Sequence, residues 1–317
     1  MQPDIVALGE PMLEMSAASE GDLSEATLFQ AGHGGDTANF CVAAARCGAR
    51  VGYATRLGDD AFGKSFERLW RAEGIDMSHV ERDPDAPTGL YFIARNHGRH
   101  DFTYYRAGSA ASRMTPTFLR GKYLRGAKLL HVSGISQGIG AGPEETVAAA
   151  VAMARGAGVL VSYDPNLRLA LWPLDRARSV IHATVPMADI LFPSFDDARV
   201  LTGLDTPEAI VQAYLELGAG LVVLKLGADG ALAASGPAHA PVLTRMPAPL
   251  VEAVDASGAG DAFCGAFVAA HLRGDGLAAC LRYACAVAAL TTTALGCAGA
   301  IPTRAALEAF CAARAAV

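Results

Sequence analysis

The sequence contains no apolar run long enough to cross a bilayer. Hydrophobic residues make up 52% of the 317 residues, yet no uninterrupted apolar stretch reaches the roughly 20 residues that a transmembrane helix needs. The first ten residues, MQPDIVALGE, have no basic segment and no signal-like apolar segment, and they are typical of a first strand. We therefore expect a cytoplasmic protein with no membrane partner.

Cysteine pairs and clustered basic charge are also missing. The seven cysteines form an odd set with no Cys-x-x-Cys spacing, within Ala-rich helical patterns. This favours buried thiols over a disulfide framework or a zinc site. The net charge is −6 and no basic stripe occurs, so we expect no nucleic-acid partner. No Gly-x-Gly-x-x-Gly follows the first strand, so a Rossmann dehydrogenase is not expected, and neither is a P-loop NTPase.

Short Val/Ile/Leu-rich runs alternate with longer Ala-rich stretches of helical period. This order predicts βαβ units and a largely parallel sheet within one large α/β domain. The expected strands lie at 4–8, 128–132, 159–163, 189–192 and 221–225, and the clearest expected helices at 37–47, 143–157 and 261–273. Gly48, Gly74 and Gly158 are expected to end helices.

Residues 11–31 and 88–106 lack the Ala-rich helical period. Strand-like runs at 89–94 and 101–106 flank Asn96-His97-Gly98, which predicts a hairpin turn. We expect both segments to form a small β-sheet that acts as a lid. The prediction is one domain over 1–317, with a lid formed by about 11–35 and 85–113. A lid of this kind exposes an edge and a face, so a homo-oligomer formed through the lid is expected.

A glycine-rich segment, DASGAGD at 255–261, precedes the expected helix 261–273 and follows a strand-like run at 250–254. Glycines let the backbone approach a ligand, and the free N–H groups of a helix start favour an anion. Asp261 would repel a static phosphate there, but it can accept a proton from an attacking hydroxyl. The alternative is that Asp261 only stabilises the start of its own helix.

The segment 254–264 resembles the second signature of the PfkB, or ribokinase, carbohydrate-kinase family, with Ala256 where Thr is usual. The resemblance covers essentially the whole chain. It implies a ribokinase-like three-layer α/β/α domain with a mostly parallel central sheet and a small β-sheet lid. It also implies that Asp261 is the catalytic base and that Gly258, Ala259 and Gly260 form an anion hole.

Residues 225–230, KLGADG, resemble the nucleotide-binding loop of this family. The resemblance implies ATP as the phosphate donor and Mg²⁺ as the cation, and it leaves a monovalent-cation requirement open. Ser194 and Asp197 stand where many members have an Asn-x-x-Glu motif, which implies Asp197 in the outer ligand shell of Mg²⁺. An acidic first turn of helix 195–202 is the alternative for Asp196. The implied ATP contacts are Asn166, Lys225, Gly227, Gly230, Gly258 and Gly260.

Residues 32–39, GHGGDTAN, match the family's first signature. Gly34 and Gly35 let a sugar approach the backbone, and Asp36 and Asn39 can hydrogen-bond its hydroxyls. Asp36 could instead be only a helix N-cap. Glu10, after the first strand, lies where the family often places an acidic sugar contact, and ordinary solvation at a strand end is its alternative.

Two arginines point to an acidic substrate. Alternate residues of a strand share a face, so in 102–106 Tyr104 and Arg106 point together and Tyr105 points away. A Tyr hydroxyl beside a guanidinium suits a carboxylate. Arg168 follows the expected strand 159–163, at the end where parallel sheets bind ligands. Packing within the lid sheet remains the alternative for Tyr104, and a salt bridge for Arg168.

Residues 34–37, 89–91, 102–106, 130–136 and 164–168, with 171–172 just after, resemble the 2-keto-3-deoxygluconate kinase subgroup. This implies ATP-dependent phosphorylation of the sugar acid 2-dehydro-3-deoxy-D-gluconate at O6. The implied substrate contacts are Gly34, Tyr91, Tyr104, Arg106 and Arg168. Residues 296–300, GCAGA, lack the acidic residue that some relatives carry there, so one sugar-hydroxyl contact stays unassigned. A neutral-sugar kinase of the fructokinase or ribokinase type and a non-catalytic nucleotide- or sugar-binding regulator remain alternatives.

Overall fold

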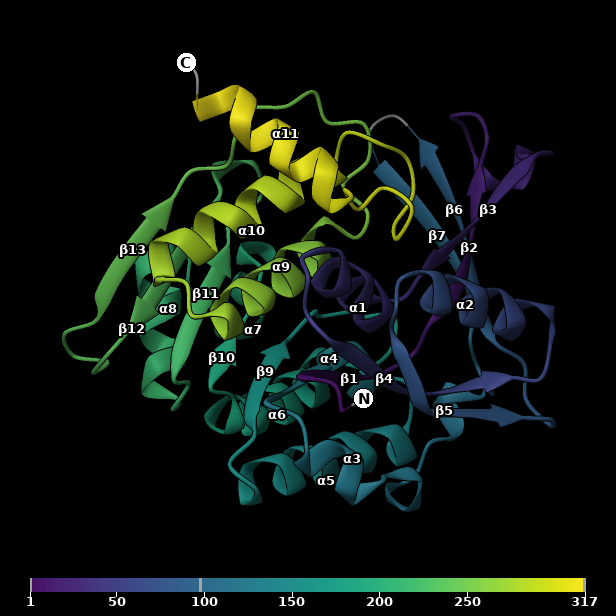
Figure 1. Cartoon of the computed structure of the whole chain (residues 1–317), viewed down its shortest axis with the longest axis horizontal. Coiled ribbons are helices and arrows are strands. Elements are labelled where there is room, and N and C mark those ends of the chain that lie inside the picture. Colours follow the sequence, from purple (N-terminus) through teal and green to yellow (C-terminus); the bar gives the residue numbers. More distant parts are fainter. Residues whose placement is uncertain (1, 97–98, 316–317) are drawn as a thin grey trace.

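The computed structural model describes residues 2–96 and 99–315, and its largest element is a nine-stranded sheet (Figure 1). Its strands are β1 Ile5–Leu8, β4 Val51–Gly58, β5 Asp76–Asp83, β8 Leu129–Ser133, β9 Leu160–Asp164, β10 Ile190–Leu191, β11 Leu221–Lys225, β12 Ala231–Ser235 and β13 Val242–Met246. The order is β13-β12-β11-β10-β9-β8-β1-β4-β5. The run from β11 to β5 is parallel, as predicted, and β12 and β13 are antiparallel.

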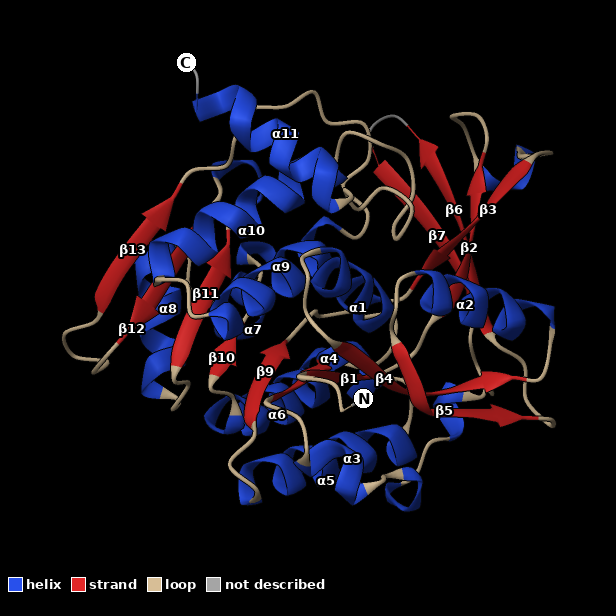
Figure 2. Ribbon diagram, viewed as in Figure 1, coloured by secondary structure: helices blue, strands red, loops and turns tan. Residues whose placement is uncertain are grey.

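Helices cover both faces of this sheet because successive strand residues point to opposite sides (Figure 2). Ile5 and Ala7 of β1 join one buried cluster, and Val6 and Leu8 join the other. The first cluster includes side chains of α1 Asp36–Arg46, α2 Ala61–Ala72, α9 Ala259–Arg273, α10 Leu277–Thr291 and α11 Arg304–Ala315. The second includes side chains of α3 Gly121–Arg125, α5 Ala141–Gly156, α6 Leu174–Thr184, α7 Phe195–Thr202 and α8 Pro207–Glu216, and the short α4 Gly134–Gly138 follows β8.

A separate four-stranded sheet, called the small sheet below, stands to the upper right of the large one in Figure 1. Its strands, in the order β3-β2-β6-β7, are β2 Met12–Ala17, β3 Phe29–Gly34, β6 Gly89–Asn96 and β7 Arg99–Tyr105. This confirms the predicted pairing of the two non-helical segments. The predicted turn residues His97 and Gly98 lie outside the described residues, and the lid role stays a prediction.

Glycines end helices where the sequence predicted them, and one predicted strand is wrong. Gly48, Gly74 and Gly158 follow helices with φ of 89°, 68° and 72°, in the left-handed region that favours glycine. The expected strand at 250–254 is a loop, and Leu250 is 90% exposed. Pro247 and Pro249 stand between β13 and this loop, and proline has no N–H to extend a ladder.

The cysteines are free thiols, and six of the seven are buried, as the sequence predicted. Cys311 on α11 is the exposed exception. Within the described part of the chain, no helix combines the length and apolar character that a membrane crossing requires.

Candidate active site

Polar side chains gather where the parallel strands β9 and β11 end and where helices α1 and α9 begin. Asp164 ends β9, Lys225 ends β11, Asp36 opens α1, and Asp261 lies in the first turn of α9. The carboxyl ends of parallel strands form the usual ligand-binding edge of such sheets. The loops after these strands and the strands of the small sheet supply the remaining candidate residues.

The glycine turn before α9 has a backbone that suits an anion. Gly258 is the N-cap, with φ of 74°, and α9 begins at Ala259. A Cβ at Gly258 would lie 3.3 Å from both Asn39 Nδ2 and Cys297 Cα, so a larger residue would crowd the turn. The first N–H groups of a helix have no intrahelical partner, and here they follow a glycine that lets a ligand approach. The Ala259 N–H donates to the Ala256 carbonyl oxygen at 3.2 Å, and the anion-hole role of Gly258, Ala259 and Gly260 stays a prediction.

Asp261 has the surroundings of a base that can hold a proton near neutral pH. Burial, followed by the neighbouring Asp36, raises its pKa to about 8, although Asn39 and Lys225 oppose the change. Asn39 Nδ2 donates to Asp261 Oδ2 at 2.9 Å. A carboxylate with this pKa accepts a proton from a hydroxyl far more readily than an exposed aspartate does.

Lys225 places a positive charge against the glycine turn. Its Nζ lies 2.5 Å from Asp164 Oδ2 and 3.6 Å from Cys264 Sγ. A Cβ at Gly260 would lie 3.6 Å from the same Nζ. Burial acts to lower the pKa of Lys225, but Asp164, Cys264 and Asp261 together outweigh it and the net shift is upward. The ammonium group therefore stays charged beside the place where an anion would sit.

The loop after Lys225 forms the tight turn that its glycines predicted. Gly227, with φ of 59°, begins a single 3₁₀ turn, Gly227–Asp229, and Gly230, with φ of 93°, follows it. A Cβ at Gly230 would overlap the backbone carbonyl of Met246. Only glycine fits this position, which brings the loop against β13.

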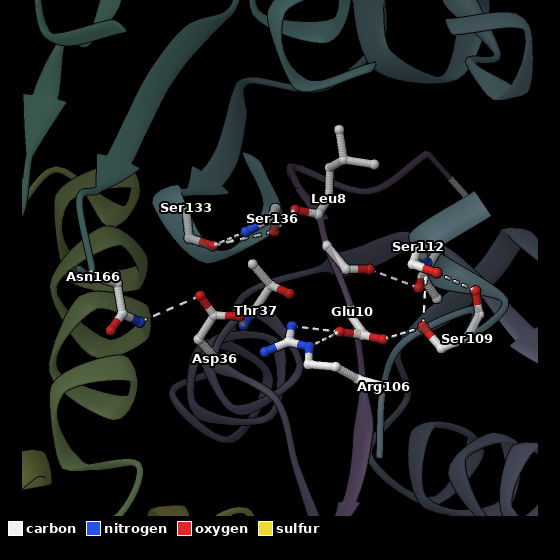
Figure 3. A network of polar contacts seen from close by, with 12 residues as sticks. Leu8, Glu10, Asp36, Thr37, Arg106, Ser109, Ser112, Ser133, Ser136 and Asn166 are labelled. Carbon is white, nitrogen blue, oxygen red and sulfur yellow. Dashed lines mark hydrogen bonds and ion pairs between the residues drawn. The ribbon is translucent and has the colours of Figure 1, made fainter. Parts of the chain in front are cut away.

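Asn166 links the residues that were predicted to bind the nucleotide with those that were predicted to bind the sugar. Its Nδ2 donates to Asp36 Oδ2 at 3.3 Å, as Figure 3 shows, and its backbone N–H donates to Asp164 Oδ1 at 3.2 Å. The structure thus places a predicted nucleotide contact, Asn166, against a predicted sugar contact, Asp36. Gly35, rather than Asp36, is the N-cap of α1. Burial raises the pKa of Asp36, while hydrogen bonds from Ser133 and the Thr37 amide oppose the shift.

Gly34 and Gly35 lie where side chains would not fit. A Cβ at Gly34 would overlap the Tyr91 hydroxyl, and one at Gly35 would overlap the Glu10 carbonyl oxygen. Gly35 also has φ of 97°. These two glycines let β3 turn into α1 directly beside Tyr91 of the small sheet.

Arg106 contacts a carboxylate of its own chain. Its Nε donates to Glu10 Oε2 at 2.8 Å, its Nη2 contacts the same oxygen, and Ser109 Oγ contacts Glu10 Oε1 (Figure 3). Glu10 is buried, which raises its pKa against the effect of Arg106. The sequence assigned Glu10 and Arg106 separately to the substrate. The structure joins them in one ion pair at the point where the chain leaves the small sheet.

Tyr104 lies close to both candidate arginines. Arg106 Cζ is 5.8 Å from the centroid of the Tyr104 ring, whereas Tyr105 contacts Phe92 instead. Burial raises the pKa of Tyr104, and the positive charges of Arg168 and Arg106 oppose this shift. Arg168 is exposed, and its Nη1 donates to the Leu167 carbonyl oxygen at 2.7 Å. The alternating strand pattern predicted that Tyr104 lies with Arg106 and that Tyr105 points away, and the contacts of these three residues agree with it.

Asp197 supports the loop that carries Arg168. Ser194 caps α7 by accepting from the Asp197 N–H, and Asp197 Oδ2 accepts from the Leu167 N–H at 3.1 Å. Burial raises the pKa of Asp197 and Arg168 opposes this. In residues 2–96 and 99–315, no three His, Cys, Asp or Glu side chains form a metal cage. A lone carboxylate near phosphates nevertheless fits Mg²⁺, which keeps much of its water.

Glu14 is a candidate that the sequence reasoning missed. It is buried on β2, directly opposite Tyr91 in the strand pairing, and its Oε2 accepts from the Tyr91 hydroxyl at 2.6 Å. Tyr91 also lies 3.3 Å from Cys297 Sγ, and a Cβ at Gly296 would lie 3.0 Å from Glu14 Oε1. Glu14 therefore brings a carboxylate to the segment 296–300, which has none of its own. A charged residue within a hydrophobic strand was the available signal.

A P-loop spacing occurs in the sequence but does not form a phosphate site. Residues 58–65, GDDAFGKS, match Gly-x-x-x-x-Gly-Lys-Ser, although a P-loop NTPase was not expected. The helix begins at Ala61, so only two residues separate it from β4. Asp60 accepts from the backbone N–H groups of Gly63 and Thr88 at 2.7 Å. A carboxylate of the chain thus occupies the place of the anion.

The large parallel sheet, the glycine turn at α9 and the small sheet together define a ribokinase-like α/β enzyme. A crystal structure of a putative ribokinase II from E. coli, in complex with ATP and Mg²⁺, superposes with a TM-score of 0.90 at 26% identity and covers 98% of this chain and 99% of that one. Residues 2–304 match the sequence profile of the pfkB family carbohydrate kinases. The chain belongs to this family and is a carbohydrate kinase.

Full-length relatives include two sugar-acid kinases and a neutral-sugar kinase. The chain is 37% identical to 2-dehydro-3-deoxygluconokinase of Thermoproteus tenax, over 94% of this chain and 91% of that protein. It is 35% identical to 2-dehydro-3-deoxygluconokinase of Bacillus subtilis (strain 168), over 98% and 96%. It is 33% identical to Fructokinase-1 of Zea mays, over 95% of each.

Proposed function

We propose that this protein transfers the γ-phosphoryl group of ATP to O6 of 2-dehydro-3-deoxy-D-gluconate. The observation that carries the acid part of the proposal is the position of Tyr104 beside the charges of Arg106 and Arg168. A hydroxyl and two guanidinium groups form a donor set that suits a carboxylate. The names of the Thermoproteus and Bacillus relatives agree with this substrate.

The nucleotide half of the site suits the phosphates of ATP. The N–H groups of the glycine turn and the ammonium group of Lys225 supply donors and positive charge at one place. The ATP and Mg²⁺ complex of the E. coli neighbour agrees with this assignment. Bound Mg²⁺ would neutralise negative charge on the phosphate oxygens. Asp197 is the residue that we assign to its outer ligand shell, and a monovalent-cation requirement is left open.

The chain's own residues divide the work of transfer between positioning and proton removal. Arg168, Tyr104 and Arg106 hold the sugar carboxylate, and Gly34, Gly35, Asp36, Glu14 and Tyr91 face its hydroxyls. Asp261 takes the proton from the O6 hydroxyl as the bond from O6 to the γ-phosphorus forms. The bond from that phosphorus to its bridging oxygen breaks, and ADP leaves. The glycine turn and Lys225 stabilise the charge that develops.

A neutral-sugar kinase is the second candidate, and two contacts favour it. Glu10 already neutralises Arg106 within the chain, and Glu14 adds an acceptor suited to a hydroxyl. Fructokinase-1 of Zea mays is also similar over almost the whole chain. If this reading holds, Arg168 alone would face the substrate as an unpaired cation.

We further propose that the small sheet closes over the sugar and that two chains associate through it. Its edge strands are β3 and β7, and Leu28, Phe102 and Tyr105 are exposed large side chains on or next to them. Paired sheets of two chains would cover these apolar side chains and the open strand edges.

ADP release in the presence of different sugars tests the proposed function. The assay compares 2-dehydro-3-deoxy-D-gluconate, fructose, ribose and nucleosides at fixed ATP and Mg²⁺. The highest kcat/KM is expected for the sugar acid. A higher value for fructose or ribose overturns the acid substrate, and a lack of turnover with every compound favours a non-catalytic regulator.

A further inference from the structure

The first turn of α1 brings two different side chains against Asp261. Asp36 and Asn39 are three residues apart, so they lie on the same side of the helix. Asp36 is a carboxylate that opposes ionisation of Asp261, and Asn39 is an amide that donates to Asp261 Oδ2 at 2.9 Å. The same helical turn therefore carries one group that raises the pKa of Asp261 and one group that lowers it.

Asn39 is enclosed by protein on the side where it meets the base. It is 2% exposed, and its Nδ2 lies 3.3 Å from the position of a Cβ at Gly258. Its Oδ1 is buried and has no hydrogen-bond partner within the described ranges 2–96 and 99–315. The amide group thus makes its side-chain hydrogen bond to Asp261, although the sequence placed Asn39 among the sugar contacts.

Other charged groups around Asp261 come from several elements. Asp164 of β9 raises the pKa of Asp261 and Lys225 of β11 lowers it. Arg106, which follows β7, lies near Asp36 and lowers the pKa of that carboxyl. The thiols of Cys264 on α9 and Cys297 in the segment 296–300 lie near the same carboxylate. Asn39 differs from all of these groups because it acts through a hydrogen bond and carries no charge.

We propose that Asn39 is a positioning residue for Asp261: its amide fixes the carboxylate toward the substrate hydroxyl and stabilises its ionised form against Asp36. The inference rests on the proposed role of Asp261 as the base. A hydrogen bond to a buried carboxylate both orients it and favours its charged form. Loss of the donor lowers the fraction of ionised base at neutral pH and leaves the carboxylate free to rotate.

Two substitutions of nearly unchanged size separate this role from sugar binding. Asn39→Asp replaces the donor with a second carboxylate, and Asp36→Asn removes the existing one. The double variant Asp36→Asn/Asn39→Asp exchanges the two groups and keeps the net charge. Asp175→Asn, at a 98% exposed position in the first turn of α6, removes a carboxylate far from the site and is the matched control.

The measurement is kcat and KM against pH, with the sugar that the wild-type enzyme turns over best. Asn39→Asp should move the rising limb of kcat up by about one pH unit, which lowers kcat near pH 7 about tenfold, with KM within about threefold of wild type. Asp36→Asn should move the rising limb of kcat to lower pH. In the double variant, this limb should lie close to its wild-type pH. A tenfold rise in KM with an unmoved limb overturns the proposal and makes Asn39 a sugar ligand.

A measurement without substrate tests the role of Asn39 even if the proposed function is wrong, because it does not depend on turnover. The free energy of unfolding is followed across pH for the same variants. Asp261 should contribute a fall in stability as pH rises through its folded pKa, and Asn39→Asp should shift this fall to higher pH. An unchanged profile in Asn39→Asp contradicts the inference even if no sugar is phosphorylated. Asn39→Ala, which adds no charge, should lower kcat without the full shift.

Discussion

The ion pair between Lys225 and Asp164 should contribute strongly to both stability and turnover. The two side chains are 13% and 6% exposed, with Nζ 2.5 Å from Oδ2. Lys225→Met removes the cation and leaves the Asp164 carboxylate buried near Asp36 and Asp261. Removal of one partner from a buried pair costs about 3–5 kcal/mol. We expect a loss of this size in the free energy of unfolding, measured by urea denaturation.

A surface pair elsewhere on the chain provides the matched control. Lys128 lies 3.2 Å from Asp4, and its side chain is 62% exposed. Lys128→Met should cost about 0–1 kcal/mol, because solvent screens exposed pairs. Asp164→Asn in the Lys225→Met background should recover part of the stability, since no lone charge then remains. Equal losses in the two lysine variants would refute the assignment of Lys225 to a buried ion pair.

The same variant should also lose activity. Lys225 Nζ lies beside the glycine turn, where it would stabilise charge on the transferred group. Loss of one such donor lowers kcat about 100-fold. ADP release at saturating ATP measures this, and a kcat within threefold of wild type would remove Lys225 from the proposed mechanism.

Three further outcomes follow from the site. Asp261→Asn should lower kcat by about 10²–10⁴-fold while ATP still binds in calorimetry, and a near-normal rate would remove Asp261 as the base. Because the folded pKa of Asp261, about 8, exceeds the unperturbed 3.8, its contribution to stability is present at acidic pH and is lost as pH rises toward 8 and above. The stability of Asp261→Asn relative to wild type should therefore increase between pH 5 and pH 9, and a constant difference would contradict the raised pKa. Arg168→Leu should raise KM for the sugar acid about tenfold or more and leave kcat/KM for fructose nearly unchanged, and an equal effect on both sugars would contradict the carboxylate assignment.

Much of the fold could be predicted because periodicity reports which faces of an element are buried. The alternation of short apolar runs and Ala-rich stretches predicted the parallel strands β1, β8, β9, β10 and β11. The segments that form β4 and β5 were not among the expected strands. The prediction of a strand at 250–254 was wrong for a specific reason. Leu250 and its neighbours are apolar enough for a strand, but two prolines precede them and the segment is exposed. Apolar composition alone does not show whether a run has a partner strand.

The sequence predicted the chemical role of single residues better than it predicted which residues they contact. The glycine motif fixed Asp261 at a helix start, and strand alternation placed Tyr104 beside Arg106. The pairing of Arg106 with Glu10 joins residues 96 positions apart, and no local pattern reports such a contact. Glu14 was missed although a charged residue within a hydrophobic strand was a local signal, because its contact with Tyr91 and its closeness to Gly296 join segments that are far apart in the sequence.

A competition assay tests the central claim most directly. Equimolar 2-dehydro-3-deoxy-D-gluconate and fructose are incubated together with wild-type enzyme, limiting ATP and Mg²⁺, and the two phosphorylated products are separated by mass. The ratio of initial rates gives the ratio of kcat/KM values in one vessel. The proposed acid site predicts that sugar-acid phosphate forms in large excess. Predominant formation of fructose phosphate would contradict it and would identify a neutral-sugar kinase.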